Sequence, residues 1–221
     1  GLTHTRLSIL DVSSAGRQPM LSKDEDIAIA FNGEIYNFKE IREFLDQNCE
    51  IIWQSSTDTE VLLNLYIYIK QIDQTFDFFL KKLNGIFSIA IWDESTHNLL
   101  LARDPFGVKP LYYFRNNNGI AFASEIKALI PLLPNLNYIS RNSFGDLDLQ
   151  AINRYLTFLW CPGDSTPIQS IKKLEPGCMV CISKGFKIDF HKWYIPSLFL
   201  AKRIPIKESK NQILSQTETL L

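Results

Sequence analysis

Apolar positions in the first third of the chain follow a strand pattern and then a helix pattern. The uninterrupted apolar run at residues 27–31 predicts a buried strand that stops at Asn32-Gly33. Apolar residues three and four positions apart follow, which is the spacing of one helix face. We therefore expect helices over residues 38–47, 59–69 and 76–83, with Asp58 as the N-cap of the second.

Further along the chain the pattern changes to pairs of strands joined by turn residues. Three hairpins are expected, from residues 86–92 with 99–103, 111–114 with 120–123, and 179–183 with 187–191. Helices are expected over residues 125–130, capped by Ser124, and over 148–158. Antiparallel hairpins with helices between them predict an α+β layered fold rather than a parallel doubly wound sheet.

A change in composition after Tyr194 indicates a domain boundary. The chain becomes polar and is interrupted by proline through Pro205, and residues 206–221 then have the pattern of a helix. We expect one domain over residues 1–194, a linker over 195–205, and the first helix of a truncated second domain over 206–221.

Charge and cysteine usage exclude some classes of protein. With 23 basic and 24 acidic residues the formal net charge is −1, which argues against a nucleic-acid surface. No run approaches the ~18 apolar residues of a membrane span. The four cysteines, together with the absence of an Asn-x-Ser/Thr glycosylation site, favour a reducing, cytoplasmic location.

The junction Asn32-Gly33 carries the first sign of chemistry. A strand that ends there places a carboxamide beside a backbone N–H that no side chain shields. Two such donors can stabilise an oxyanion. Asn-Gly is also a common hairpin turn, so the pair has a purely structural alternative.

Several segments, taken together, resemble one known family. They are His-Thr-Arg-Leu-Ser-Ile at 4–9, Asn-Gly-Glu-Ile-Tyr-Asn at 32–37, Ser-Thr-Asp-Thr-Glu at 56–60, Arg-Asp-Pro-Phe-Gly-Val-Lys-Pro-Leu-Tyr at 103–112, Phe-Ala-Ser-Glu-Ile-Lys-Ala-Leu at 122–129 and Lys-Leu-Glu-Pro-Gly-Cys at 173–178. In this order they resemble the glutaminase domain of asparagine synthetases, within the class II (N-terminal nucleophile) glutamine amidotransferases. The resemblance covers residues 1–194.

The resemblance implies a four-layer α/β/β/α sandwich and a site for free L-glutamine. It assigns Arg6 to the α-carboxylate of glutamine, which a guanidinium can hold bidentately. It assigns Asp58, helped by Glu34, to the α-ammonium, and Asn32 with Gly33 to the oxyanion hole. Each has a plainer alternative: Arg6 as a structural ion-pair partner, Asp58 as a helix cap, and Glu34 as a solvated turn residue.

Two parts of that family's machinery are missing from residues 1–221. The family's nucleophile is an N-terminal cysteine, but no cysteine precedes Arg6, and Cys49 is expected in a loop between a helix and a strand. The Ser-Gly-Gly-x-Asp loop that binds ATP in the synthetase half is absent. We therefore expect an inactive fragment, incomplete at its N-terminus, with no cofactor or metal of its own; ATP and Mg²⁺ belong to the missing synthetase domain.

Other interpretations remain open at this point. The chain could be a catalytically dead amidotransferase-like module that binds amino acids or a partner protein, or a class II amidotransferase with a different acceptor. A zinc site of Cys161, Cys178, Cys181 and His191 is conceivable, although residues i and i+3 of a strand face opposite sides. The Arg103-Asp104 pair is expected to be architectural. The resemblance also suggests a homodimer.

Overall fold

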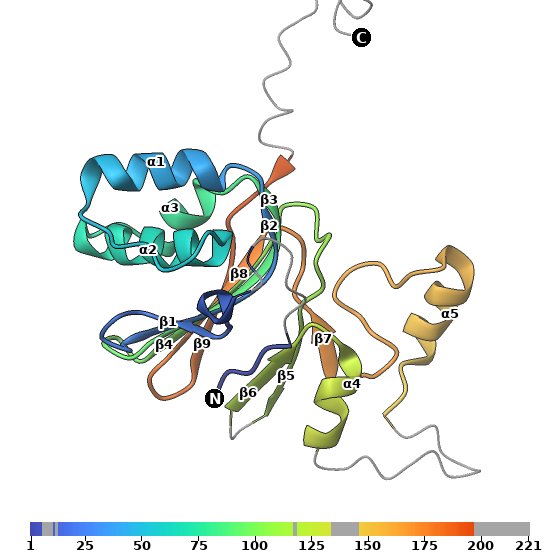
Figure 1. Cartoon of the computed structure of the whole chain (residues 1–221). Helices are drawn as coiled ribbons and strands as arrows, with labels where there is room; N and C mark the ends of the chain where they lie inside the picture. The colour runs from blue at the N-terminus through green and yellow to red at the C-terminus, as the bar shows by residue number, and fades with distance from the viewer. Residues whose placement is uncertain (6–10, 12, 117–118, 134–145, 197–221) are drawn as a thin grey trace, which may run out of the picture.

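The computed structural model describes residues 1–5, 11, 13–116, 119–133 and 146–196, and there it forms four layers (Figure 1). Two antiparallel sheets pack face to face, and helices cover their outer sides. The predicted α+β fold with mainly antiparallel sheets is therefore confirmed. Arg6, most of the linker and the helix expected at 206–221 lie outside the described residues.

The larger sheet has the strand order β1-β2-β3-β4-β8-β9 and the smaller one the order β6-β5-β7. The strands of the larger sheet are β1 (Met20–Leu21), β2 (Ile27–Ile35), β3 (Gly85–Asp93), β4 (Asn98–Arg103), β8 (Cys178–Ser183) and β9 (Lys187–Lys192). Those of the smaller are β5 (Tyr112–Asn116), β6 (Gly119–Ala123) and β7 (Ile171–Lys173). All three predicted hairpins are confirmed as β3-β4, β5-β6 and β8-β9.

Helices occupy the two outer layers. The first layer contains α1 (Phe38–Asn48), α2 (Asp58–Gln71) and α3 (Phe76–Lys81). On the other side α4 (Ile126–Leu129), which continues into the 3-10 turn Ile130–Leu132, packs on the smaller sheet. Helix α5 (Leu149–Phe158) lies beside this layer, and Ala151 is its buried residue. A further 3-10 turn spans Ser14–Gly16.

Three hydrophobic clusters hold the layers together. The largest, including Leu62, Phe79 and Phe87, fills the space between α1–α3 and the larger sheet. The second lies between the sheets and the third between the smaller sheet and α4. Neighbouring residues Leu100 and Leu101 of β4 enter different clusters, because successive side chains of a strand point to opposite faces.

The same alternation decides the arrangement of the two cysteines on β8. Cys178 packs against the cluster between the sheets, and Cys181 packs against the cluster beneath the helices. The two thiols therefore lie on opposite faces of the sheet, as expected from their spacing. That separation rules out a shared metal ion bound by both side chains.

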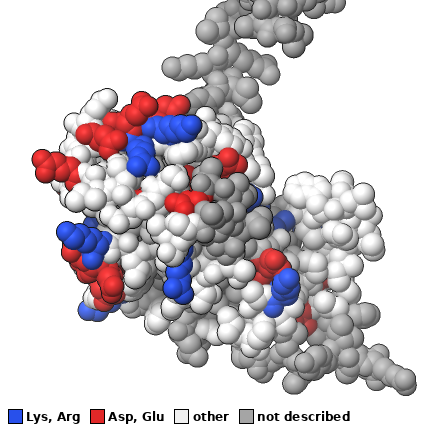
Figure 2. Space-filling view, in the orientation of Figure 1, with Lys and Arg blue, Asp and Glu red and all other residues white. Residues whose placement is uncertain are grey.

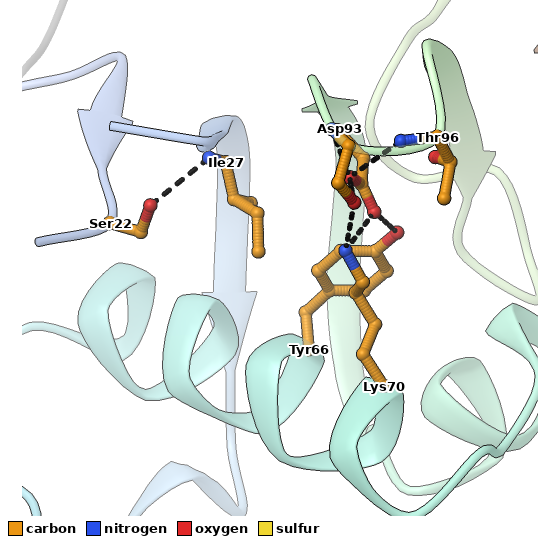
Figure 3. A network of polar contacts seen from close by, with 7 residues as sticks. Ser22, Ile27, Tyr66, Lys70, Asp93 and Thr96 are labelled. Atoms are coloured by element: carbon orange, nitrogen blue, oxygen red, sulfur yellow. Dashed lines mark hydrogen bonds and ion pairs between the residues drawn. The ribbon is translucent and has the colours of Figure 1, made fainter. Parts of the chain in front are cut away.

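A polar cluster fastens α2 to the end of β3 (Figure 3). Tyr66 Oη donates to Asp93 Oδ2 at 3.0 Å, Lys70 Nζ lies 2.6 Å from the same oxygen, and Ser95 Oγ donates to Oδ1 at 2.7 Å. Burial opposes ionisation of Asp93, but these donors outweigh it and lower its pKa. Burial and the neighbouring carboxylate raise the pKa of Tyr66, which stays a neutral donor.

The Arg103-Asp104 pair connects β4 to the loop that follows it. The Arg103 guanidinium donates to the carbonyl oxygens of Lys109, Leu174 and Gly107 at 2.7, 2.6 and 2.6 Å. The fully buried Asp104 carboxylate accepts from backbone N–H groups at residues 87, 106, 108 and 109. These contacts are all to backbone, so the pair shapes the loop, in agreement with its expected architectural role.

Several local expectations were wrong. Strand β2 does not stop at Asn32 but continues to Ile35, because Asn32–Ile35 pair with Ser88–Gly85 of β3. The N-cap of α2 is Thr57, whose Oγ1 accepts from the Glu60 N–H at 3.2 Å; Asp58 is the first helical residue. No side chain caps α4, whose N-cap position is Glu125 rather than Ser124. Cys49 lies between two helices, α1 and α2.

The face of the molecule drawn in Figure 2 carries both basic and acidic side chains. In the view of Figure 2, basic and acidic side chains are interspersed over the α1–α3 layer, and the region of α5 is largely uncharged. Among the described helices, none combines the length and apolar character needed to cross a bilayer.

Candidate functional site

A cleft of about 750 Å³ lies beside the edge of β2. The predicted residues Asn32, Gly33, Glu34 and Asp58 all line it. Its walls come from β2, the first turn of α2, β3, the end of β6 and residues 3–5. Thus segments far apart in the sequence meet at one opening. Arg6 lies outside the described residues, and its neighbour Thr5 lines the cleft.

The hydrogen-bond direction along β2 exposes one particular amide to this cleft. Alternate residues of an antiparallel strand direct their N–H groups to the same side. The Tyr36 N–H donates to Asn84 on the β3 side, so the odd-numbered residues point the other way. Strand β1 pairs only as far as Ile29, and beyond it the odd-numbered amides have no partner strand.

The outward-facing N–H groups two residues before and two residues after Gly33 each donate to a side chain. The Phe31 N–H donates to Gln18 Oε1 at 2.7 Å, and the Ile35 N–H donates to Asp58 Oδ2 at 3.2 Å. Gly33 lies between them, and its N–H faces the open edge of the sheet. This amide is therefore placed to donate to an oxygen atom inside the cleft, which is what an oxyanion site requires.

The close approach of the neighbouring strand β3 also requires a glycine at position 33. A Cβ at this position would lie 2.1 Å from the Ile86 carbonyl oxygen and 2.7 Å from Phe87 Cα. Both are backbone atoms of β3, so they cannot move aside without disturbing the sheet. The close approach of β2 and β3 thus excludes any side chain at position 33.

The Asn32 carboxamide reaches across the cleft to the other sheet. Its Nδ2 donates to Ser124 Oγ, immediately after β6, over 3.4 Å. An amide nitrogen carries two hydrogens, so one is left for a further acceptor. Ser124 thus orients the nitrogen of Asn32, and the side chain can act as the second donor beside Gly33.

Asp58 is the buried anion of the site, with 5% of its surface exposed. Burial raises its pKa despite the hydrogen bond from the Ile35 N–H, and the negative charge of Glu34 raises it further. Glu34 itself is exposed at the cleft. A cation that entered between these two carboxylates would offset both the burial and the repulsion.

Sequence reasoning missed some of the residues around this cleft. Gln18, Thr59 and Ser124 line it and hold its walls, yet none of them was predicted as a site residue. Their partners are 41 and 92 positions away, so no local pattern could reveal the contacts. The segment 122–129 was noted for its resemblance, which was the one available signal for Ser124.

Neither a thiol nor a metal centre is found in this cleft. All four cysteines, Cys49, Cys161, Cys178 and Cys181, lie in the described part as free thiols, and none of them lines the cleft. Within the described ranges, no group of three or more His, Cys, Asp or Glu residues could hold a metal ion. The described residues that line the cleft include hydrogen-bonding and charged groups.

Comparison with curated proteins finds asparagine synthetases among the relatives of this chain. Asparagine synthetase [glutamine-hydrolyzing] 1 of Bacillus subtilis (strain 168) is 36% identical over 216 residues, which cover 98% of this chain and 31% of that protein. Putative asparagine synthetase [glutamine-hydrolyzing] 1 of Methanocaldococcus jannaschii is 43% identical over 141 residues, 64% of this chain and 24% of that protein. The chain thus spans about a third of these relatives or less.

Solved structures share the fold. A glutamine phosphoribosylpyrophosphate amidotransferase from B. subtilis matches 87% of this chain and 34% of its own, with a TM-score of 0.56 and 22% identity. The structure described as the allosteric regulatory enzyme of purine biosynthesis matches 86% of this chain and 34% of its own, with a TM-score of 0.57 and 22% identity. The family model of the glutamine amidotransferase domain matches residues 1–194. The chain therefore belongs to the glutamine amidotransferase domain family.

Proposed function

We propose that this cleft binds free L-glutamine and stabilises the oxyanion formed when the side-chain amide is hydrolysed to glutamate and ammonia. One observation carries the proposal. The Asn32 carboxamide, the outward-facing Gly33 amide and the buried Asp58 carboxylate lie around a single opening. Two donors and an anion are the set needed to hold a carbonyl oxygen and an ammonium group at opposite ends of one ligand.

Each predicted residue has a distinct task in this proposal. Arg6 pairs with the α-carboxylate of glutamine, and Asp58 with Glu34 receives the α-ammonium. When a nucleophile attacks the side-chain carbonyl carbon, the electron pair of the C=O bond moves to the oxygen. The N–H groups of Asn32 and Gly33 donate to that oxygen, and each donor of this kind contributes about 10²–10³ in turnover.

The rest of the reaction is assigned to other parts of a longer protein. None of the four cysteines lines the cleft, and we propose that another segment of a longer protein supplies the attacking thiol. We infer that the ammonia serves an ATP- and Mg²⁺-dependent amidation of aspartate in a second domain, because the named relatives are asparagine synthetases. A cytoplasmic location and a homodimer are proposed with it.

Calorimetric titration of the chain tests this function. We expect L-glutamine to bind, and N-acetyl-L-glutamine and L-glutaminamide to bind at least tenfold more weakly, because each lacks one of the two charges that the clamps recognise. An Arg6→Lys variant should also lose affinity, since an ammonium cannot reproduce the bidentate geometry. Equal affinity for all three ligands, or no binding of L-glutamine, would contradict the proposal.

The affinity for L-glutamine is expected to fall as the pH is lowered. Only ionised Asp58 attracts the ammonium group, and its raised pKa means that it takes up a proton at a higher pH than an ordinary carboxyl, for which the value is about 3.9. Titrations at a series of pH values should show the dissociation constant rising through this region, with a flatter profile for Asp58→Asn. A wild-type profile as flat as that of the variant would be evidence against this role of Asp58.

A further inference from the structure

Gln18 is a half-buried side chain at the cleft that touches both walls of the site. It precedes β1 and reaches the part of β2 that β1 no longer covers. Its Oε1 accepts from the Phe31 N–H at 2.7 Å. Gln18 therefore takes the place of a missing strand at the amide two residues before Gly33.

The other end of the same carboxamide reaches α2. Gln18 Nε2 donates to Thr59 Oγ1 at 3.2 Å, and Thr59 is 3% exposed. Thr59 directly follows Asp58 in the first turn of the helix. One side chain thus connects the strand that carries the oxyanion donors to the helical turn that carries the buried carboxylate.

A second connection lies on the far side of Gly33, where Asp58 accepts from the Ile35 N–H. The strand is therefore tied to the beginning of α2 both before and after Gly33. Pairing with β3 holds the inner edge of β2 along its whole length, and the Gln18 and Asp58 contacts hold its outer edge to the beginning of α2. With both edges held, the separation between the Gly33 amide and the Asp58 carboxylate is fixed, and that separation must match the length of one amino acid.

We propose that Gln18 is the positioning residue of the glutamine site, setting the distance between the oxyanion donors and the ammonium-binding carboxylate. The inference rests on the proposed function. Gln18 acts through Phe31 and Thr59 rather than by contact with the ligand. A carboxamide suits this task because it has an acceptor and a donor at one end of a three-bond stem.

The test compares isosteric variants by calorimetry with L-glutamine at 25 °C, after urea unfolding has established that each variant is folded at that temperature. Gln18→Met keeps the volume and removes both hydrogen bonds, and Thr59→Val removes only the connection to α2. We expect Thr59→Val, which loses one neutral hydrogen bond, to weaken L-glutamine binding up to about tenfold, and Gln18→Met, which loses two, to weaken it at least as much. Gln47→Met makes the same chemical change on the exposed side of α1 and should bind as wild type does.

Further variants separate positioning from folding stability. Thr59→Ser retains the hydroxyl and should bind more tightly than Thr59→Val. The double variant Gln18→Met/Thr59→Val should bind L-glutamine no more weakly than Gln18→Met alone. The hydrogen bond between residues 18 and 59 is already lost in the single variant. A purely structural role would lower the free energy of unfolding and leave the affinity of the folded protein unchanged; that result overturns the inference while the proposed function stands. If the wild type itself does not bind L-glutamine, the result contradicts both the role of Gln18 and the proposed function.

Discussion

Replacing Asp104 with alanine is expected to lower the free energy of unfolding by about 4 kcal/mol. The carboxylate is fully buried and accepts from the backbone N–H groups of Phe87, Phe106, Val108 and Lys109 at 3.0–3.3 Å. Alanine leaves these donors without their acceptor, and the Phe87 N–H is buried, so water has little access to this donor. Each buried donor without a partner costs about 1–3 kcal/mol.

Urea unfolding measures this effect, with the midpoint and slope fitted separately. Asp104→Asn should be less damaging, since it retains one acceptor oxygen. Asp24→Ala removes an exposed carboxylate and should change stability by no more than about 0.5 kcal/mol. A loss below about 1 kcal/mol for Asp104→Ala would mean that the carboxylate does not organise this loop.

Replacing Asp58 with asparagine is expected to weaken L-glutamine binding roughly 100-fold, equivalent to about 2.8 kcal/mol. The variant keeps an oxygen for the Ile35 N–H, so the strand contact can remain. It removes the buried negative charge that the α-ammonium needs. Calorimetry at neutral pH measures the change, and Asp24→Asn, an exposed substitution of the same kind, should bind as wild type does.

Stability should change in the opposite direction in the same variant. Burial raises the pKa of Asp58, so above that pKa the ionised carboxylate destabilises the fold, and this penalty disappears as the pH falls and the group is protonated. A neutral asparagine avoids it at every pH. Asp58→Asn should therefore unfold at the same or a higher urea concentration near neutrality. If Asp58→Asn lost L-glutamine binding because the variant was unfolded, the result would assign Asp58 a structural role rather than a role in ligand recognition.

The sequence predicted the layered fold because its main signals are local. The period of apolar residues distinguishes the helices from the hairpins, and turn residues mark where each hairpin bends. The short strands β1 and β7 were not expected, since runs of two and three residues carry no period. Their positions depend on the strands that they pair with, which lie elsewhere in the chain.

The site shows the same division between local and distant contacts. Asn32, Gly33, Glu34 and Asp58 were placed by resemblance, and they line one cleft. The reason that Gly33 can donate was predicted wrongly. Turn propensity favoured a strand end at this pair, but pairing with β3 carries the strand to Ile35, and the amide faces the cleft because β1 is short. That geometry depends on three strands, so it could not be derived from one segment.

The amide resonance of Gly33 in ¹⁵N-labelled protein tests the central claim most directly. As L-glutamine is added, the account predicts that this resonance shifts in proportion to the bound fraction, and further than those of Gly163 and Gly185, which are exposed and do not line the cleft. If the protein is saturated with L-glutamine and the Gly33 resonance shifts no further than those of Gly163 and Gly185, the ligand binds elsewhere.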